Sequence, residues 1–224
     1  PHPRAKRATV EAARVVLEAA VAAGAPRDII GWIDEPSVEL SRALMNHPQV
    51  DLILATGGPG MVRAAYSSGK PAIGVGAGNT PAVIDETANV PMAVNSILLS
   101  KTFDNGMICA SEQAVVVVAG VYDAVHEEFR RRGAVIVNDA QKAALAKVVA
   151  PEGVLNAAIV GQPAAKIAAM AGIEVPADTK VLIAEVTGVG PDEPLSIEKL
   201  SPVLAMYRAE DFAKALDTAD ALVQ

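Results

Sequence analysis

The sequence of 224 residues fits one large domain or two small ones, because single hydrophobic cores stop growing at roughly 250 to 300 residues. Its residues are 51% hydrophobic but only 3% aromatic, so the core must consist mainly of Ala, Val, Ile and Leu, as is typical of α/β proteins. A net charge of −7 without an extended basic stripe argues against a nucleic-acid partner. No apolar run approaches the roughly 20 residues of a membrane helix, so no membrane partner is expected.

The single cysteine, Cys109, cannot form an internal disulfide, which fits a reducing compartment. The N-terminal region has charges followed by apolar residues, as a signal peptide would. Glu11, Arg14 and Glu18 interrupt the apolar part at helical spacing, so the region is interpreted as an ordinary amphipathic helix. A cytoplasmic protein is therefore expected.

The first third of the sequence predicts alternating helices and strands with short connections. Helices are expected over 4–23, from the N-cap Ser37 to about 46–48, and over 61–67, and strands over 29–33, 50–55 and 72–75. The run 50–55 is apolar apart from Asp51, and such a run is typical of a strand covered on both faces. This alternation predicts βαβ units and a parallel sheet, as in part of a Rossmann-type nucleotide-binding domain.

A glycine-rich segment over 74–81 interrupts this alternation, and a domain boundary is expected near 78–84, dividing the chain into 1–80 and 81–224. The second part is again α/β. Its expected helices cover 90–102, 122–131, 139–149, 164–171 and 209–223, and its expected strands cover 114–118, 134–137, 180–184 and 200–207.

Cys109 is the candidate nucleophile. It lies three residues after Gly106, which can bend the backbone through conformations closed to other residues, and just before the predicted strand 114–118. A thiol on such a loop, held against a rigid strand, is positioned as a reacting group must be. A lone cysteine is equally consistent with a small buried hydrophobe. Of the histidines that could pair with it through the fold, His47 resembles a helix end and His126 a polar helix face.

The loop 56–60, Thr-Gly-Gly-Pro-Gly, follows a predicted buried strand and precedes a helix. Backbone amides and the helix dipole favour a phosphate at such a place, and glycines let a ligand approach the backbone. The loop does not contain the G-x-G-x-x-G pattern of dinucleotide-binding folds, so a structural turn remains an alternative.

Five stretches occur in the order of the motifs of a known family: PHPRAK at 1–6, LATGGPGMV at 54–62, GVGAGNTP at 74–81, FDNGMICASEQ at 103–113 and EKLSP at 198–202. Together they resemble the CoA-acylating aldehyde dehydrogenases, and in particular the aldehyde dehydrogenase half of the bifunctional aldehyde-alcohol dehydrogenases. The resemblance runs essentially from end to end. It implies an aldehyde dehydrogenase-like fold, in which 1–80 belong to the NAD-binding domain and 81–224 to the catalytic domain.

The resemblance also implies roles for individual residues. Cys109 falls on the catalytic cysteine, which forms a thiohemiacetal with an aldehyde and then an acyl thioester that coenzyme A removes. The expected cofactor is NAD, the cosubstrate is coenzyme A, the partners are a short-chain aldehyde and acyl-CoA, and no metal is expected. The residues that the resemblance assigns to the cofactor are Thr56, Gly57, Gly58, Gly76, Glu198 and, near the adenosine end, His2. By itself, Glu198 is also consistent with a solvated glutamate at the start of a strand.

One departure from the wider aldehyde dehydrogenase pattern concerns hydrolysis. Hydrolytic members carry a glutamate just before a glycine pair, and this glutamate activates water. The matching segment here, 73–78, contains no carboxylate. Without a general base for water, the acyl-enzyme is expected to survive until a thiol attacks it.

A second departure is that the sequence starts inside the family's cofactor domain and lacks the upstream segment that donates to the oxyanion. Because one oxyanion donor typically contributes about 10² to 10³ in rate, this chain alone is expected to be weakly active or inactive. A non-catalytic nucleotide-binding module that contributes to a homo-oligomer is the alternative. Labelling of Cys109 with and without NAD discriminates between the two, because only an assembled site changes the reactivity of the thiol.

Overall fold

The computed structural model describes residues 5–224, which form two compact units. The first unit ends at Gly76 and the second runs from Ala77 to Gln224. Each unit has its own parallel sheet, and each is described below by itself. Within residues 5–224, no helix combines the length and the apolar character needed to cross a membrane.

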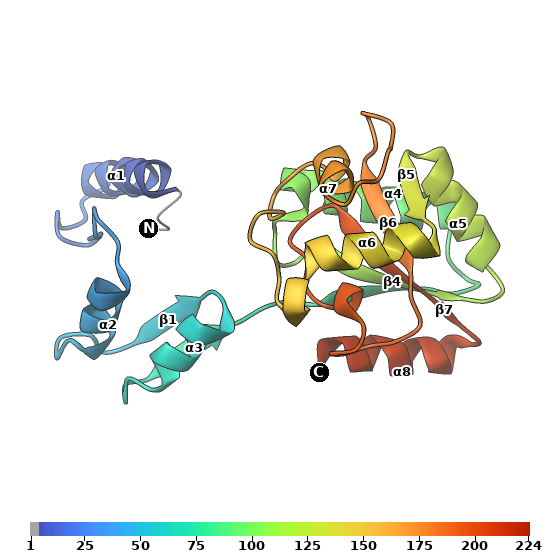
Figure 1. Ribbon diagram of the computed structural model, residues 1–224. Coiled ribbons are helices and arrows are strands. Elements are labelled where there is room, and N and C mark those ends of the chain that lie inside the picture. Colours follow the sequence, from blue (N-terminus) through green and yellow to red (C-terminus); the bar gives the residue numbers. More distant parts are fainter. Residues whose placement is uncertain (1–4) are drawn as a thin grey trace. The chain divides into compact units, whose positions relative to one another are not determined.

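The described part of the first unit, residues 5–76, has two parallel strands and three helices. Figure 1 shows these elements in blue to cyan. They are α1 (Lys6–Ala22), α2 (Val38–Asn46), β1 (Ile53–Thr56), α3 (Pro59–Tyr66) and β2 (Ala72–Val75). The Ser37 side chain accepts a hydrogen bond from Leu40 N, as expected of the N-cap of α2. The predicted strand over 29–33 is wrong, since these residues form a turn and an irregular segment. Ile29 is 57% exposed, and a short apolar run becomes a strand only where a neighbouring strand pairs with it.

Strand β1 is covered on one face only. Ile53 and Ala55 pack with Ala65 of α3, whereas Leu54 between them is 72% exposed. The prediction that this strand is covered on both faces is therefore wrong for the unit as described. The sequence predicted the strand correctly because apolar, β-branched runs favour strands, but the number of covering layers depends on tertiary packing.

The second unit is a five-stranded parallel sheet in the order β3-β4-β7-β6-β5. Its strands are β3 (Thr80–Ile84), β4 (Glu112–Val118), β5 (Ala134–Val137), β6 (Val181–Glu185) and β7 (Val203–Ala209). Its helices are α4 (Val90–Thr102), α5 (Tyr122–Arg131), α6 (Asp139–Val149), α7 (Ala164–Met170) and α8 (Phe212–Val223), with short 3-10 turns at Phe103–Gly106, Pro151–Gly153 and Pro194–Ser196. The α/β prediction is confirmed, and β3 is a strand that the sequence analysis did not predict.

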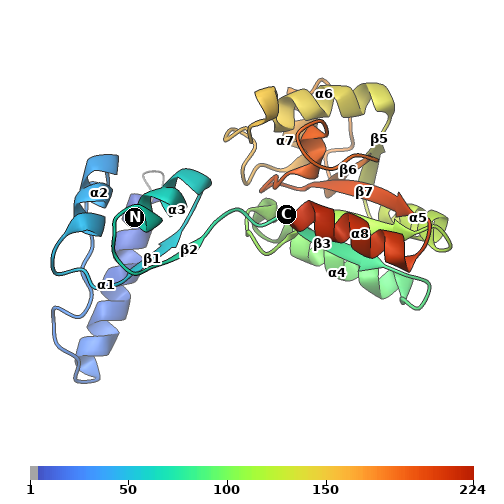
Figure 2. The same ribbon diagram turned by 90° about the horizontal axis from the view of Figure 1, so that it is seen from below.

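Helices cover both faces of this sheet (Figure 2). Helices α6, α7 and α8 pack on one face, where Val116 and Ala205 are fully buried. Helices α4 and α5 pack on the other face, where Val115, Phe129 and Leu204 lie in the core. Because both faces are covered, β4 is buried along six of its seven residues. A continuous apolar run such as this is the sequence pattern expected of a central parallel strand.

The core is expected to respond much more strongly to Phe129→Ala than to Phe212→Ala. Phe129 on α5 is fully buried and Phe212 on α8 is 48% exposed, so the same truncation leaves a cavity only at Phe129. We expect Phe129→Ala to lower the free energy of unfolding by about 3 to 5 kcal/mol, and Phe212→Ala to lower it by well under half of that. Urea unfolding followed by circular dichroism measures both. Equal losses in the two variants would show that Phe129 does not hold the α4–α5 layer on the sheet.

Candidate active site

Three segments that are far apart in the sequence meet at the edge of the sheet where β3, β4 and β7 begin. Gly78, Cys109 and Glu198 each lie a few residues before one of these strands. Because the three strands are adjacent and parallel, the segments that lead into them lie at the same edge. The candidate site is therefore built at the amino ends of the strands, opposite to the carboxyl ends at which ligands usually bind in open α/β sheets.

The loop that carries Cys109 follows α4 and a 3-10 turn, Phe103–Gly106, and leads into β4. Its conformation is fixed by Ser111, whose backbone N donates to Ile108 O at 3.0 Å and whose Oγ contacts Gly106 O at 3.3 Å. Ser111 is buried, whereas Cys109 is exposed. The interpretation of Cys109 as a buried hydrophobe is therefore wrong, and its thiol is accessible on an ordered loop.

Gly106 lets this loop lie close to the segment that precedes β7. Its φ is +68°, and a Cβ at this position would lie 2.8 Å from Ser201 O and 2.9 Å from Lys101 O. Both neighbours are backbone carbonyls, which cannot move aside as a flexible side chain can. Asn105, also at positive φ, donates from Nδ2 to Gly161 O at 3.0 Å. The sequence motif therefore requires glycine at 106 both for the turn and for the close approach.

Gly78 joins Cys109 to Glu198. Its backbone N donates to Oε1 of Glu198 at 2.9 Å, across 120 positions of sequence. A Cβ on Gly78 would lie 2.8 Å from the carbonyl oxygen of Cys109. The same residue thus holds the Glu198 carboxylate and contacts the backbone of Cys109, and a larger residue there would push these two groups apart. Glu198 is half-buried.

Below the loop lies a buried polar cluster of Lys101, Gln113 and Lys199, all fully buried. Gln113 Oε1 accepts from Lys101 Nζ at 3.1 Å and from the backbone N of Lys199 at 2.9 Å, and Gln113 Nε2 donates to Ser111 O at 3.2 Å. Lys199 Nζ donates to the carbonyls of Leu195 and Ile197. Every polar atom of the Gln113 amide therefore has a partner, as buried polar groups require.

Burial removes the two ammonium groups from water and lowers their pKa values. The pKa of Lys101 falls to about 7, although the charges of Glu112 and Glu198 oppose the shift. The pKa of Lys199 is also lowered, because of burial first and of the neighbouring Lys101 second. The cluster is thus a place where one proton is held weakly near neutral pH.

The sequence analysis did not select Gly78, Lys101, Gln113 or Lys199 as site residues. A signal for Lys101 was present: it follows Val94 by seven positions and Ile97 by four, on the buried face of α4. A lysine at a core position of a helix is almost always paired. Gln113 ends the motif 103–113, but nothing local indicated its role, because its partners Lys101, Ser111 and Lys199 lie on three segments.

Thr56, Gly57, Gly58 and Gly76 belong to the first unit, whereas Cys109 and Glu198 belong to the second. Thr56 ends β1, and Gly58 is the N-cap of α3 in an exposed loop. No atom lies within 4 Å of a Cβ built on Gly58 or on Gly76, so the backbone is open to a ligand at both. His2 lies outside the described residues.

The remaining histidines are not assembled with the thiol in the part of the chain that the structure describes. His126 lies on α5 beside Tyr122, with 6.3 Å between the ring centroids, and makes no hydrogen bond with Cys109. His47 is the C-cap of α2 in the first unit, which matches its prediction as a helix end. Among residues 5–224, no group of three His, Cys, Asp or Glu side chains could hold a metal ion.

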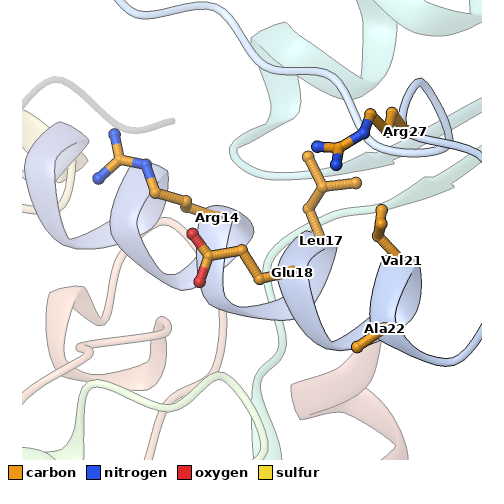
Figure 3. A pocket seen from close by; sticks show the side chains of 6 residues that line it. All are labelled: Arg14, Leu17, Glu18, Val21, Ala22 and Arg27. Atoms are coloured by element: carbon orange, nitrogen blue, oxygen red, sulfur yellow. The ribbon is translucent and has the colours of Figure 1, made fainter.

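A surface hollow lies along α1 in the first unit (Figure 3). Charged side chains of Arg14, Glu18 and Arg27 line it together with Leu17 and Val21. None of the candidate site residues lines it, and α1 has no buried residue. The hollow is an open groove beside an exposed helix and is not part of the candidate site.

Gly106→Ala is expected to destabilise the protein more than Gly172→Ala, although both glycines have φ of +68°. The left-handed conformation costs a non-glycine residue roughly 1 to 2 kcal/mol at either position. Nothing lies within 4 Å of a Cβ on Gly172, whereas two carbonyl oxygens block it at Gly106. Thermal unfolding of both variants measures the difference. A Gly106→Ala variant as stable as Gly172→Ala would refute the close packing of the loop.

The buried amine of Lys101 predicts a pH dependence of stability. Between pH about 7 and about 10.4 the folded protein holds the amine neutral while the unfolded chain holds it charged, so the free energy of unfolding rises with pH. Lys101→Met lacks this rise. We expect the stability of the wild type relative to Lys101→Met to increase as pH increases from about 7 to about 9.5.

Urea unfolding at several pH values measures this difference, and Lys166→Met, at an exposed position on α7, is the control. The relative stability of Lys166→Met should stay constant over the same range. A constant difference for Lys101→Met as well would contradict the weakly held proton.

Comparison with known proteins places the chain in a family. Residues 4–170 match the model of the aldehyde dehydrogenase family. The chain is 66% identical over 223 residues to the bifunctional aldehyde-alcohol dehydrogenase AdhE of Escherichia coli (strain K12). The alignment covers 100% of this chain and 25% of that protein.

Solved structures agree. An acetylating aldehyde dehydrogenase from Geobacillus thermoglucosidasius superimposes with a TM-score of 0.95 at 50% identity, over 99% of this chain and 49% of that chain. A propionaldehyde dehydrogenase of Rhodopseudomonas palustris with bound propionyl-CoA has a TM-score of 0.89 at 34% identity, over 100% of this chain and 49% of that chain. The chain thus spans a quarter to a half of these relatives, and the resemblance to acylating aldehyde dehydrogenases is confirmed. The chain belongs to the aldehyde dehydrogenase family.

Proposed function

We propose that the protein is an NAD-dependent, CoA-acylating aldehyde dehydrogenase that interconverts acetaldehyde and acetyl-CoA through a thioester on Cys109. The observation that carries the proposal is the exposed Cys109, whose backbone carbonyl lies against Gly78, the residue whose N–H donates to the Glu198 carboxylate. The acylating relatives, including one with bound propionyl-CoA, support the substrate class.

The chemistry follows from the thiol. The sulfur of Cys109, as thiolate, attacks the aldehyde carbon, a C–S bond forms, and the carbonyl π electrons move to oxygen. The C=O bond then re-forms as the carbon loses its hydride, which leaves an acyl thioester on Cys109. The thiolate of coenzyme A attacks this thioester, and the Cys109 thiolate leaves as acyl-CoA forms. In the reverse direction the same steps reduce acyl-CoA to the aldehyde and consume reduced cofactor, as a fermentative cell requires.

NAD supplies the hydride acceptor when it is bound, and the residues present fit it. Oε1 of Glu198 accepts from Gly78, and its Oε2 has no hydrogen-bond partner within residues 5–224. A carboxylate oxygen that only accepts suits the hydroxyl of a ribose. In the first unit, Gly58 begins α3 with open space over its backbone, which suits a phosphate. We assign Thr56, Gly57, Gly58, Gly76 and Glu198 to NAD, with His2 at its adenosine end.

Coenzyme A, rather than water, is the proposed acyl acceptor. The segment 73–78 contains no carboxylate, and its Gly78 contacts the backbone of Cys109. Glu198, the carboxylate bound to Gly78, is engaged by a backbone N–H and is assigned to the cofactor. Because the segment that carries the water-activating glutamate in hydrolytic members has no carboxylate here, we expect the thioester to persist until a thiol attacks it.

On this proposal, 1–80 contribute to the NAD-binding domain and 81–224 to the catalytic domain of a cytoplasmic homo-oligomer. A non-catalytic assembly module is the second candidate, and one observation favours it. Leu54, Ile73 and Val75 of the first unit's sheet are each about half exposed or more, and apolar residues in this number usually pack against another surface.

Acylation of Cys109 by acetyl-CoA tests the proposal directly. Incubation with acetyl-CoA is expected to give a single acetyl group by intact-mass spectrometry, removable by hydroxylamine because thioesters are cleaved by it and lysine amides are not. Cys109→Ala should give none, and since the chain has no other cysteine the control is complete. NADH should then release the acetyl group as acetaldehyde faster than NADPH does.

Absence of a hydroxylamine-sensitive acetyl group in the wild type would refute acyl transfer on Cys109 in this chain and favour the assembly module. Acylation followed by equal rates with NADH and NADPH would keep the acyl-transfer chemistry and refute NAD as the specific cofactor.

A further inference from the structure

Gln113 forms hydrogen bonds with both segments of the candidate site, the Cys109 loop and the Glu198 segment. Its Nε2 donates to Ser111 O, two residues beyond Cys109, and its Oε1 accepts from the backbone N of Lys199, the residue after Glu198. Gly78 contacts the same two segments, through a hydrogen bond to Glu198 Oε1 and a close approach to the Cys109 carbonyl. The Cys109 loop and the Glu198 segment are therefore clamped at two points, one backbone glycine and one buried side chain.

Lys101 is one of three groups that determine which way the Gln113 amide faces. Two donors, Lys101 Nζ and Lys199 N, point at Oε1, and one acceptor, Ser111 O, lies at Nε2. In the opposite orientation, Nε2 would face two donors and Oε1 would face a carbonyl, which leaves buried groups without partners. An alkyl side chain at position 101 would remove one of the two donors that impose this orientation. The amine can donate whether it is charged or neutral.

We propose that Gln113 is a positioning residue that fixes Cys109 relative to Glu198 for hydride transfer, and that Lys101 acts through Gln113 by orienting its amide. The inference rests on the proposed function, in which Cys109 carries the acyl group and Glu198 holds the cofactor. Neither Gln113 nor Lys101 touches the reacting atoms, because both are buried below the loop.

The reaction has two parts that depend differently on this clamp. Acylation of Cys109 by acetyl-CoA needs the thiol and the thioester substrate. Reduction of the acyl group by NADH needs, in addition, Cys109 to lie at the correct place relative to the Glu198 segment. A shift of about 1 Å in such an arrangement costs about 10²-fold in rate. Loosening the clamp should therefore slow the NADH step much more than the acylation step.

The experiment compares Gln113→Leu and Lys101→Met with the wild type and with Tyr207→Phe. Tyr207 is 3% exposed and donates to Gly188 O at 3.0 Å, so Tyr207→Phe removes one buried hydrogen bond outside the clamp. Gln113→Leu is expected to lower the rate of NADH oxidation at least about tenfold while it lowers the rate of Cys109 acylation less than about threefold. Lys101→Met should shift the same ratio in the same direction but less, and Tyr207→Phe should leave the ratio unchanged.

The double variant Lys101→Met/Gln113→Leu separates positioning from stability. With both polar partners replaced by apolar side chains, thermal stability should recover part of what Gln113→Leu loses, because the Lys101 amine is no longer buried without a partner. The NADH step should remain as slow as in Gln113→Leu alone, since Lys101 acts through Gln113. Recovery of the NADH step together with stability, or equal slowing of both steps in Gln113→Leu, would overturn the proposal.

Hydrogen exchange provides a readout that does not depend on activity. In Gln113→Leu, amides of 103–111 and of 196–201 should both exchange faster than in the wild type and in Tyr207→Phe. If the wild type shows no acylation, the proposed function fails, and hydrogen exchange alone then tests whether Gln113 holds the two segments together. Faster exchange in both segments supports the clamp, and faster exchange in one segment or in neither overturns it.

Discussion

The parallel pairing of β4 with β3 on one side and β7 on the other is the constraint on which the candidate site depends. Val115 pairs with Ala82 and with Met206, so the three strands start at one edge of the sheet. Gly78, Cys109 and Glu198 precede these strands and are brought together for that reason alone. No local interaction within any one of the three segments could place them, because Gly78 and Glu198 are 120 positions apart.

The site combines rigid packing with an accessible reactive group. Gly106 and Gly78 allow backbones to approach to distances that a Cβ would prevent, and Ser111 and Gln113 tie the Cys109 loop down from inside. Cys109 itself stays exposed. A reacting group on a loop whose supports are buried fulfils two requirements of catalysis, access for the substrate and a fixed position.

Two lysines in the core below the loop are unusual, since buried lysines are rare and their charge is costly. The lowered pKa values of Lys101 and Lys199 express this cost. In return, Lys101 Nζ supplies one of the three hydrogen bonds of the Gln113 amide, and Lys199 Nζ donates to the carbonyls of Leu195 and Ile197. The interior of this unit thus keeps a polar network beside the candidate site, while mostly apolar side chains cover the faces of the sheet.

The sequence by itself determined most of the elements and the α/β class, and it selected Cys109 as the candidate nucleophile. Continuous apolar runs such as 114–118 favour buried strands, Ser37 is a favourable N-cap residue, and a lone cysteine after a glycine turn stands out without a structure. Local sequence pattern did not predict three features correctly: the strand expected over 29–33, the strand β3 and the exposed face of β1. The reason is that a strand forms only beside a partner strand, and a face is buried only where another layer packs on it. Only the tertiary structure decided that Gln113 joins the Cys109 loop to the Glu198 segment. Hydrogen bonds between residues 86 positions apart follow from strand order and leave no trace in local periodicity.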